Sequence, residues 1–320
     1  MEELRELLNG KMSWLKDLSE QNILMHNDLD AILSVGFLEK YAKLKNVVGI
    51  YDNSVFYAED TSFLKDINIH NCIGVDLDFM IPKMKTLGHH ITGLLKTGEN
   101  YNVNDLCEIT KNISQIGFSY GSKYPLNEII FLYSLFGLQP ETDNEIALLV
   151  YADSVFKNYV DYRLNVRSWL KRLGQTNILN ALDTRSPDIY GIIASRIIPL
   201  TKCFGGDEPH NQFQITGYNK DLRKKMYIGK PQFLINFINK NFGWDMNILP
   251  DKLSYTRQLY YHEFNLGNSK DDEKIGLLLE YVNDKLQGKE EIYSASLTKK
   301  NELKITSKKK FSLENILQTQ

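Results

Sequence analysis

The sequence has few cysteines and no long apolar run. Its three cysteines, Cys72, Cys107 and Cys203, include no Cys-x-x-Cys pair. This argues against a disulfide framework and against a cysteine-ligated zinc site. The apolar run "EIIFLYSLFGL" (128–138) is shorter than the roughly 20 residues that span a bilayer. The first twenty residues are too charged for a signal peptide. We therefore expect a reduced, cytoplasmic protein that does not enter a membrane.

An excess of charge of one sign is also lacking. The formal net charge is −2 and the isoelectric point is about 6.3. A dedicated binder of duplex DNA carries a broad basic field, so we do not expect that class of protein. A small or single-stranded polyanionic substrate stays compatible, because a local cationic patch is enough to hold it.

Short apolar runs alternate with amphipathic stretches along the first half of the chain. The runs that predict strands are residues 22–26, 46–53, 71–79 and 145–153. The stretches that predict helices are residues 28–45 and 126–138. Such alternation is typical of an α/β fold with a mostly parallel sheet flanked by helices.

The pattern changes after about residue 185. A polar, glycine-bearing segment at 203–212 is followed by aromatic strand-like pieces and helical pieces. We therefore predict a first domain at 1–195 and a smaller α+β domain at 196–320.

Histidines and carboxylates gather just after the predicted strands. They are His26, Asp28, Asp30, Asp76, Asp78, His89, His90 and Asp153. In a parallel sheet, functional side chains collect beyond the carboxyl ends of the strands. Carboxylate and imidazole together suit a divalent ion such as Mn²⁺, Mg²⁺ or Zn²⁺. Their number is enough for a two-metal site with a shared carboxylate, which would lower the pKa of a bound water.

Plainer roles are open for several of these residues. Asp28 precedes an apolar helical stretch and is an N-cap candidate, a role that it could combine with metal binding. We expect Asp78 to cap a helix and Asp52 to lie in a turn. Arg163 and Arg167 follow the last cluster and are candidates for contacting substrate phosphates, with a solvated helix face as the alternative.

Four segments resemble the motifs of the DHH phosphoesterases, in order and in context. They are "HNDLD", "VDLD", "GHH" and "YAD", and the resemblance covers roughly residues 20–180. The family includes RecJ-type single-strand exonucleases, oligoribonucleases, cyclic-dinucleotide phosphodiesterases and family II inorganic pyrophosphatases. The resemblance implies a metal-binding catalytic domain, here 1–195, and a smaller substrate-binding domain, here 196–320, with the active site in the cleft between them.

The resemblance also implies roles for single residues. The metal ligands would be His26, Asp28, Asp30, Asp76, His89 and Asp153. Asp76 would be the catalytic carboxylate that two metals share. His90 would contact a phosphate or assist the leaving group. Gly88 stands where the family has the Asp of Asp-His-His, and the glycine-rich "GGGH" motif of many nucleotide-cleaving members is absent from the sequence.

The implied function is hydrolysis of phosphodiester bonds by a metal-activated water, with two Mn²⁺ ions or with Mg²⁺. The expected substrates are short oligonucleotides, cyclic dinucleotides or single-stranded nucleic acid ends, and a homodimer is compatible with this plan. One alternative is a degenerate binding or regulatory module without turnover, which Gly88 favours. Another is a haloacid dehalogenase-type phosphatase, in which Asp76 would be the nucleophile and Asp78 the acid/base.

Overall fold

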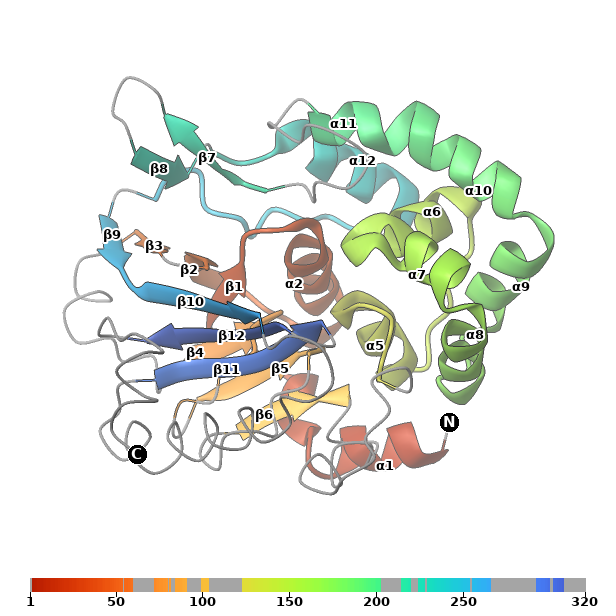
Figure 1. Cartoon of the computed structure of the whole chain (residues 1–320), viewed down its shortest axis with the longest axis horizontal. Helices are drawn as coiled ribbons and strands as arrows, with labels where there is room; N and C mark the ends of the chain where they lie inside the picture. Colours follow the sequence, from red (N-terminus) through yellow and green to blue (C-terminus); the bar gives the residue numbers. More distant parts are fainter. Residues whose placement is uncertain are drawn as a thin grey trace.

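A seven-stranded, mostly parallel sheet forms the centre of the computed structural model (Figure 1). Helices flank this sheet, so the predicted α/β class is confirmed. The predicted segment 203–212 lies outside the residues that the structure describes. Those residues are 2–53, 55–59, 72–79, 81, 84–90, 99–103, 123–202, 214–219, 224–227, 229–253, 255–265, 292–299 and 302–307.

The strands of the sheet follow the order β6-β5-β4-β1-β2-β3-β9. Their bounds are β1 (Asn22–His26), β2 (Asn46–Asp52), β3 (Val55–Ala58), β4 (Cys72–Val75), β5 (Lys85–Gly88), β6 (Glu99–Asn102) and β9 (Tyr255–Gln258). Neighbours from β6 to β2 are parallel, whereas β3 and β9 are antiparallel to their neighbours. The strands predicted at 22–26 and 46–53 are confirmed as β1 and β2, and within the strand predicted at 71–79 the described residues form a strand only over Cys72–Val75.

The order of the strands reverses between β1 and β4. From β1 the chain passes through α2 (Leu29–Ala42) to β2, on one side of β1. β4 lies on the other side of β1 and leads to β5, farther in that direction. The chain therefore leaves the carboxyl ends of β1 and β4 in opposite directions. In open α/β sheets, ligands bind at such a switch point.

Most of the helices that the structure describes lie in the middle of the chain, and α6 to α11 gather on one side of the molecule (Figure 1). Among the described residues, the helices besides α2 are α1 (Glu2–Asn9), α5 (Glu128–Leu135), α6 (Asp143–Tyr151), α7 (Val155–Asp161), α8 (Arg163–Arg172), α9 (Thr176–Thr184), α10 (Ser186–Ile192), α11 (Ile198–Lys202) and α12 (Gln232–Phe242). Two 3₁₀ turns, η1 (Ser13–Lys16) and η5 (Ala152–Ser154), and a π-helical turn, η6 (Ile193–Ile197), accompany them. Among the described residues, no helix combines the length and apolar character that crossing a membrane requires.

The strand predicted at 145–153 is wrong, because this segment forms α6. Thr142 and Glu145 make a capping box at its start: Thr142 Oγ1 accepts from the Glu145 N–H at 3.2 Å, and Glu145 Oε2 accepts from the Thr142 N–H at 2.8 Å. Such a box supplies partners for N–H groups that a starting helix leaves open. The apolar run itself is buried throughout, so its hydrophobic pattern does not distinguish a buried helix from a buried strand.

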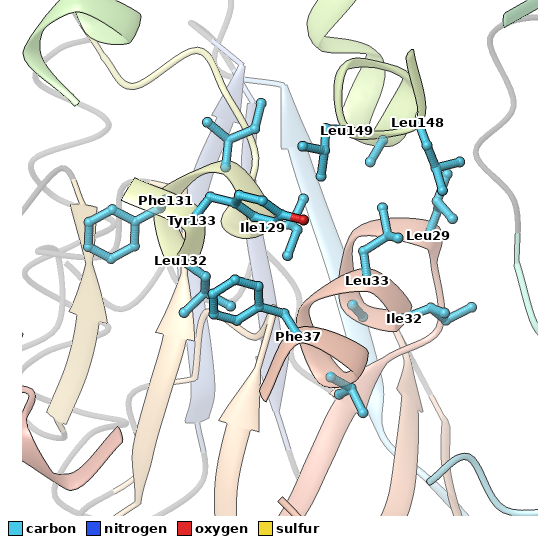
Figure 2. Packing of buried hydrophobic residues seen from close by; sticks show 14 of the residues in the cluster. Leu29, Ile32, Leu33, Phe37, Ile129, Phe131, Leu132, Tyr133, Leu148 and Leu149 are labelled. Atoms are coloured by element: carbon cyan, nitrogen blue, oxygen red, sulfur yellow. The ribbon is translucent and has the colours of Figure 1, made fainter. Parts of the chain in front are cut away.

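The main core lies between one face of the sheet and the helices α2, α5 and α6. Figure 2 shows Phe37 and its neighbours on α2 facing Leu132 and Tyr133 on α5. Ile23 and Met25 of β1 belong to this core, whereas Leu24 belongs to a smaller core with Tyr51 and Phe56. Successive strand residues point to opposite faces, so β1 is buried on both sides.

The C-terminal part of the chain also packs onto this framework. β9 pairs with β3 in the central sheet, and Leu234 and Trp244 belong to the main core. The remaining strands form a β7-β8 pair (Thr216–Asn219 and Lys224–Tyr227) and a β10-β12-β11 sheet (Tyr260–Asn265, Glu302–Ser307 and Ile292–Lys299). The domain boundary near residue 195 stays a prediction, and the core contains residues from both sides of it.

We predict that Phe37→Ala lowers the free energy of unfolding by about 3–5 kcal/mol, because it leaves a cavity in the centre of the core. The Phe37 ring is fully buried and lies 5.1 Å from the Tyr133 ring and 5.2 Å from the Phe136 ring, between centroids. Urea unfolding followed by circular dichroism measures the change. Phe233→Ala is the matched control: this ring is 71% exposed, so its loss should cost less than about 0.5 kcal/mol. Equal effects of the two variants would contradict the assigned core.

Candidate metal centre

Two groups of carboxylates and imidazoles meet where β1, β4 and β5 end. One consists of Asp30, Asp76, His89 and Asp153, and the other of His26, Asp28 and Asp76. Within each group, one ligand atom from every residue lies within 4.8 Å of the others. The structure therefore brings together all six residues predicted as ligands, and Asp76 belongs to both groups.

The two oxygens of Asp76 face different groups. Oδ1 lies 3.3 Å from His89 Nδ1, and Oδ2 lies 3.8 Å from His26 Nδ1. The residue follows β4 directly and has a left-handed backbone, with φ of 54°. Asp tolerates this conformation better than most residues, yet it is still an uncommon one, and such backbone conformations cluster at functional sites. The turn aims the carboxylate between the two groups.

Asp28 and His26 form a closely bonded pair after β1. Asp28 Oδ1 accepts from the Ala31 N–H at 3.1 Å and so caps α2, as expected from the sequence. Asp28 Oδ2 lies 2.6 Å from His26 Nδ1. Asp28 thus combines helix capping with a place in the donor group.

Asp30 is fully buried and joins the first segment to helix α5. Its Oδ2 accepts from the Glu128 N–H at 2.7 Å and its Oδ1 from the Ile129 N–H at 3.0 Å. The N-terminus of a helix favours negative charge at this position. Even so, burial together with Asp76 and Asp153 raises the pKa of Asp30 well above its ordinary value.

Asp153 reaches the site from the end of a helix rather than from the end of a strand. It lies in the tight turn η5 after α6, where Asp153 and Ser154 have φ of 51° and 56°. Its Oδ2 lies 3.1 Å from His89 Nε2. Asp153 therefore lies beside the other predicted ligands, and it follows a helix rather than the predicted strand.

His90 pairs with Asp78, and neither residue belongs to the two donor groups. The distance from His90 Nδ1 to Asp78 Oδ2 is 2.7 Å. The prediction that Asp78 caps a helix is wrong, because no helix follows it within residues 79, 81 and 84–90. The side chain of His90 is 30% exposed, against 10% for His89. His90 is thus the more accessible imidazole of the two.

The histidines of the donor groups carry positive charge in this arrangement. Burial alone would lower the pKa of His26, but Asp28 and Asp76 raise it to about 10. Burial likewise opposes the charge on His89, and Asp153 and Asp76 raise its pKa well above the ordinary value. For Asp76, burial and Asp28 raise the pKa. Protons thus supply part of the positive charge that the carboxylates need.

Lys123 and Glu128 also belong to the surroundings of the site and were not predicted. Burial lowers the pKa of Lys123 to about 8, and the charges of Asp78 and Asp153 partly oppose this. Lys123 therefore lies within electrostatic reach of these carboxylates. Glu128 is fully buried, and neither of its carboxylate oxygens has a hydrogen-bond partner among the residues that the structure describes. Burial and Asp30 raise the pKa of Glu128. No local sequence pattern marks either residue.

Arg163 and Arg167, the predicted phosphate contacts, lie on α8. Arg163 Nη2 is 3.6 Å from Asp183 Oδ1, and Arg167 forms an ion pair with the same carboxylate. Tyr159 donates a hydrogen bond to Asp183 as well. A role in substrate binding stays a prediction, and it would require these side chains to exchange Asp183 for a phosphate.

Asp52 links the site to the C-terminal part of the chain. It ends β2 beside the turn to β3, as expected, but its side chain is fully buried. Asp52 Oδ2 accepts from Thr216 Oγ1 at 2.6 Å, and Asn27 Nδ2 donates to the same Thr216 oxygen at 2.8 Å. The Ile215 N–H donates to the Asn27 carbonyl at 2.9 Å. The segment 214–216 thus lies against Asn27, the residue between His26 and Asp28.

The donor set fits a divalent metal ion. Four carboxylates and two imidazoles offer oxygen and nitrogen ligands of the kind that Mn²⁺, Mg²⁺ and Zn²⁺ accept. The donor atoms of each group lie within 4.8 Å of one another, a spacing that suits ligands gathered around one cation. Comparisons with protein-family models, with curated proteins and with solved structures gave no match.

We predict that single substitutions remove the two metal sites separately or together. Wild type should bind two Mn²⁺ ions, and His26→Gln and Asp153→Asn should each bind one. Asp76→Asn should weaken both sites by about 100-fold or more, because a ligand matters at least as much as its outer-shell partners. Titration calorimetry and metal analysis after dialysis measure this. Asp188→Asn, an exposed residue on α10, is the control. Wild-type binding by Asp76→Asn would contradict the shared carboxylate.

We also predict that metal binding releases protons and weakens as pH falls. His26 and His89 have raised pKa values, so they hold protons at neutral pH, and a metal must displace those protons to reach the imidazoles. The apparent dissociation constant should therefore increase from about pH 8 to about pH 6. Calorimetry in buffers of different ionisation enthalpy counts the protons. A binding enthalpy that is independent of the buffer would contradict this prediction.

Proposed function

We propose that this chain is a divalent-metal-dependent phosphoesterase of the DHH type that hydrolyses phosphodiester bonds. The observation that carries the proposal is the position of Asp76, whose two oxygens face two separate donor groups. The resemblance of "VDLD" assigns the same residue as the carboxylate that two metals share.

The residues of the site would have different roles in hydrolysis. When bound, a pair of Mn²⁺ or Mg²⁺ ions lowers the pKa of water and neutralises charge on a phosphoryl group. The two donor groups hold the ions. Lys123, which lies near Asp78 and Asp153, is a cation that can contact a non-bridging phosphate oxygen. His90 can take up a proton from solvent at Nε2 and pass it to the leaving oxygen, while its Nδ1 keeps the hydrogen bond to Asp78.

The small net charge favours a short substrate. We expect dinucleotides, cyclic dinucleotides or single-stranded ends, held through local contacts rather than by a broad basic surface. We place the protein in the cytoplasm and regard a homodimer as compatible with the proposal. In the haloacid dehalogenase alternative Asp78 would act as acid/base, and its hydrogen bond to His90 favours the metal-dependent reading instead.

The test is a panel of substrates with the Mn²⁺-loaded protein. It should contain linear dinucleotides, cyclic dinucleotides, labelled single-stranded DNA, pyrophosphate and a p-nitrophenyl phosphodiester. We expect turnover of at least one phosphodiester, and we expect Asp30→Asn and Asp153→Asn to lower kcat/KM by about 100-fold or more, since each removes a ligand.

Two outcomes would overturn the proposal. Stoichiometric Mn²⁺ binding without turnover on the whole panel would indicate the binding module instead. Undiminished turnover by Asp30→Asn and Asp153→Asn would separate the activity from the metal centre. Asp188→Asn, which lies on the exposed side of α10, should keep wild-type kinetics and serves as the matched control.

A further inference from the structure

We propose that Asp78 is the residue that positions His90, and that Gly88 is required because the Asp78 carboxylate occupies the space beside it. The inference rests on the proposed function for its catalytic meaning, since His90 is the residue proposed to pass a proton. Its structural part, the orientation and tautomer of His90, stands on the geometry alone.

Both oxygens of Asp78 engage His90. Oδ2 lies 2.7 Å from Nδ1 of the ring, and Oδ1 accepts from the His90 backbone N–H at 3.4 Å. The carboxyl group of an aspartate is ordinarily ionised at neutral pH. An ionised carboxylate only accepts hydrogen bonds, so Nδ1 of His90 must carry a proton. The ring then exchanges protons with a substrate at Nε2.

Gly88 leaves the space that this pair needs. A Cβ atom at position 88 would lie 2.4 Å from Asp78 Oδ1 and 3.1 Å from the Leu77 carbonyl oxygen. The Leu77 N–H donates to the Leu87 carbonyl at 2.8 Å, which holds the ends of β4 and β5 together. The backbone therefore cannot easily move away from a larger residue. A side chain at position 88 would therefore displace the Asp78 carboxylate from its place beside His90.

The orientation of the His90 ring is important because the ring lies beside His89, a residue of one donor group. The His89 and His90 rings lie 4.3 Å apart, between centroids, with an angle of 34° between their planes. His89 belongs to a donor group and His90 does not. Asp78 thus holds a proton-carrying imidazole beside a metal ligand without joining the ligand set. Loss of Asp78 should free the His90 ring while leaving the donor groups complete.

Histidine NMR tests the structural part without any need for activity. In ¹⁵N-histidine-labelled protein with diamagnetic Mg²⁺, wild-type His90 should show a proton on Nδ1, and His90→Gln assigns the signal. Asp78→Ala should shift His90 toward the Nε2–H tautomer. Asp78→Ala combined with Gly88→Asp returns a carboxylate to the emptied space and should restore the Nδ1–H signal. Gly88→Asp alone should destabilise the protein, because the new Cβ meets Asp78. An unchanged His90 tautomer in Asp78→Ala would overturn the proposal.

Kinetics and metal binding test the catalytic part. Asp78→Ala should lower kcat by about 10–100-fold, the usual cost of losing an orienting partner, with KM and Mn²⁺ stoichiometry unchanged. The double variant should recover part of kcat. A changed tautomer with wild-type kcat, or a loss of bound Mn²⁺, would overturn the positioning role. If wild type turns over no substrate, the proposed function fails, and the NMR result still decides whether Asp78 positions His90.

Discussion

The concentration of buried negative charge at one end of the sheet is the constraint on which the rest of the structure depends. Asp28, Asp30 and Asp76 converge there because the ends of β1 and β4 are neighbours, and Asp153 meets them from α6. Buried charges are costly unless they are paired. The fold supplies partial compensation at helix N-termini, where α2 receives Asp28 and α5 receives Asp30. Protonated histidines supply more, and a divalent cation would complete the balance.

The chain also accepts backbone strain to bring these groups together. Asp76 and Asp153 both have left-handed backbones, each of which costs on the order of 1–3 kcal/mol. The surrounding core holds them in place: Phe37 on α2 packs against α5, and α6 ends at Tyr151, two residues before Asp153. Rigid packing beneath the site thus fixes side chains that local preferences alone would not place there. Packing of the core thus offsets the cost of the strained backbone at the carboxyl ends of the central strands.

Sequence reasoning succeeded where local pattern and function coincide. β1 and α2 follow from a short apolar run and a capped amphipathic stretch, and Asp28 was expected both as cap and as candidate ligand. It failed for α6, because an apolar run that is buried on all sides has no diagnostic period. It also missed Lys123 and the Asp78–His90 pair. Those contacts join distant segments, and their location depends on which strands become neighbours, a property that no local window contains.

The structure gives Gly88 an interpretation that differs from the one suggested by the sequence motif. In the Asp-His-His motif that this segment resembles, an aspartate occupies the position of Gly88. The loss of that carboxylate favours a binding module without turnover. In the structure the same position is where a carboxylate from the preceding strand end makes contact, since Asp78 Oδ1 fills the place of a Cβ at 88. His90 lies outside both donor groups, so metal binding alone does not require its orientation. A fixed imidazole beside the donor groups is suited to moving a proton, and the proposed catalytic role depends on this arrangement.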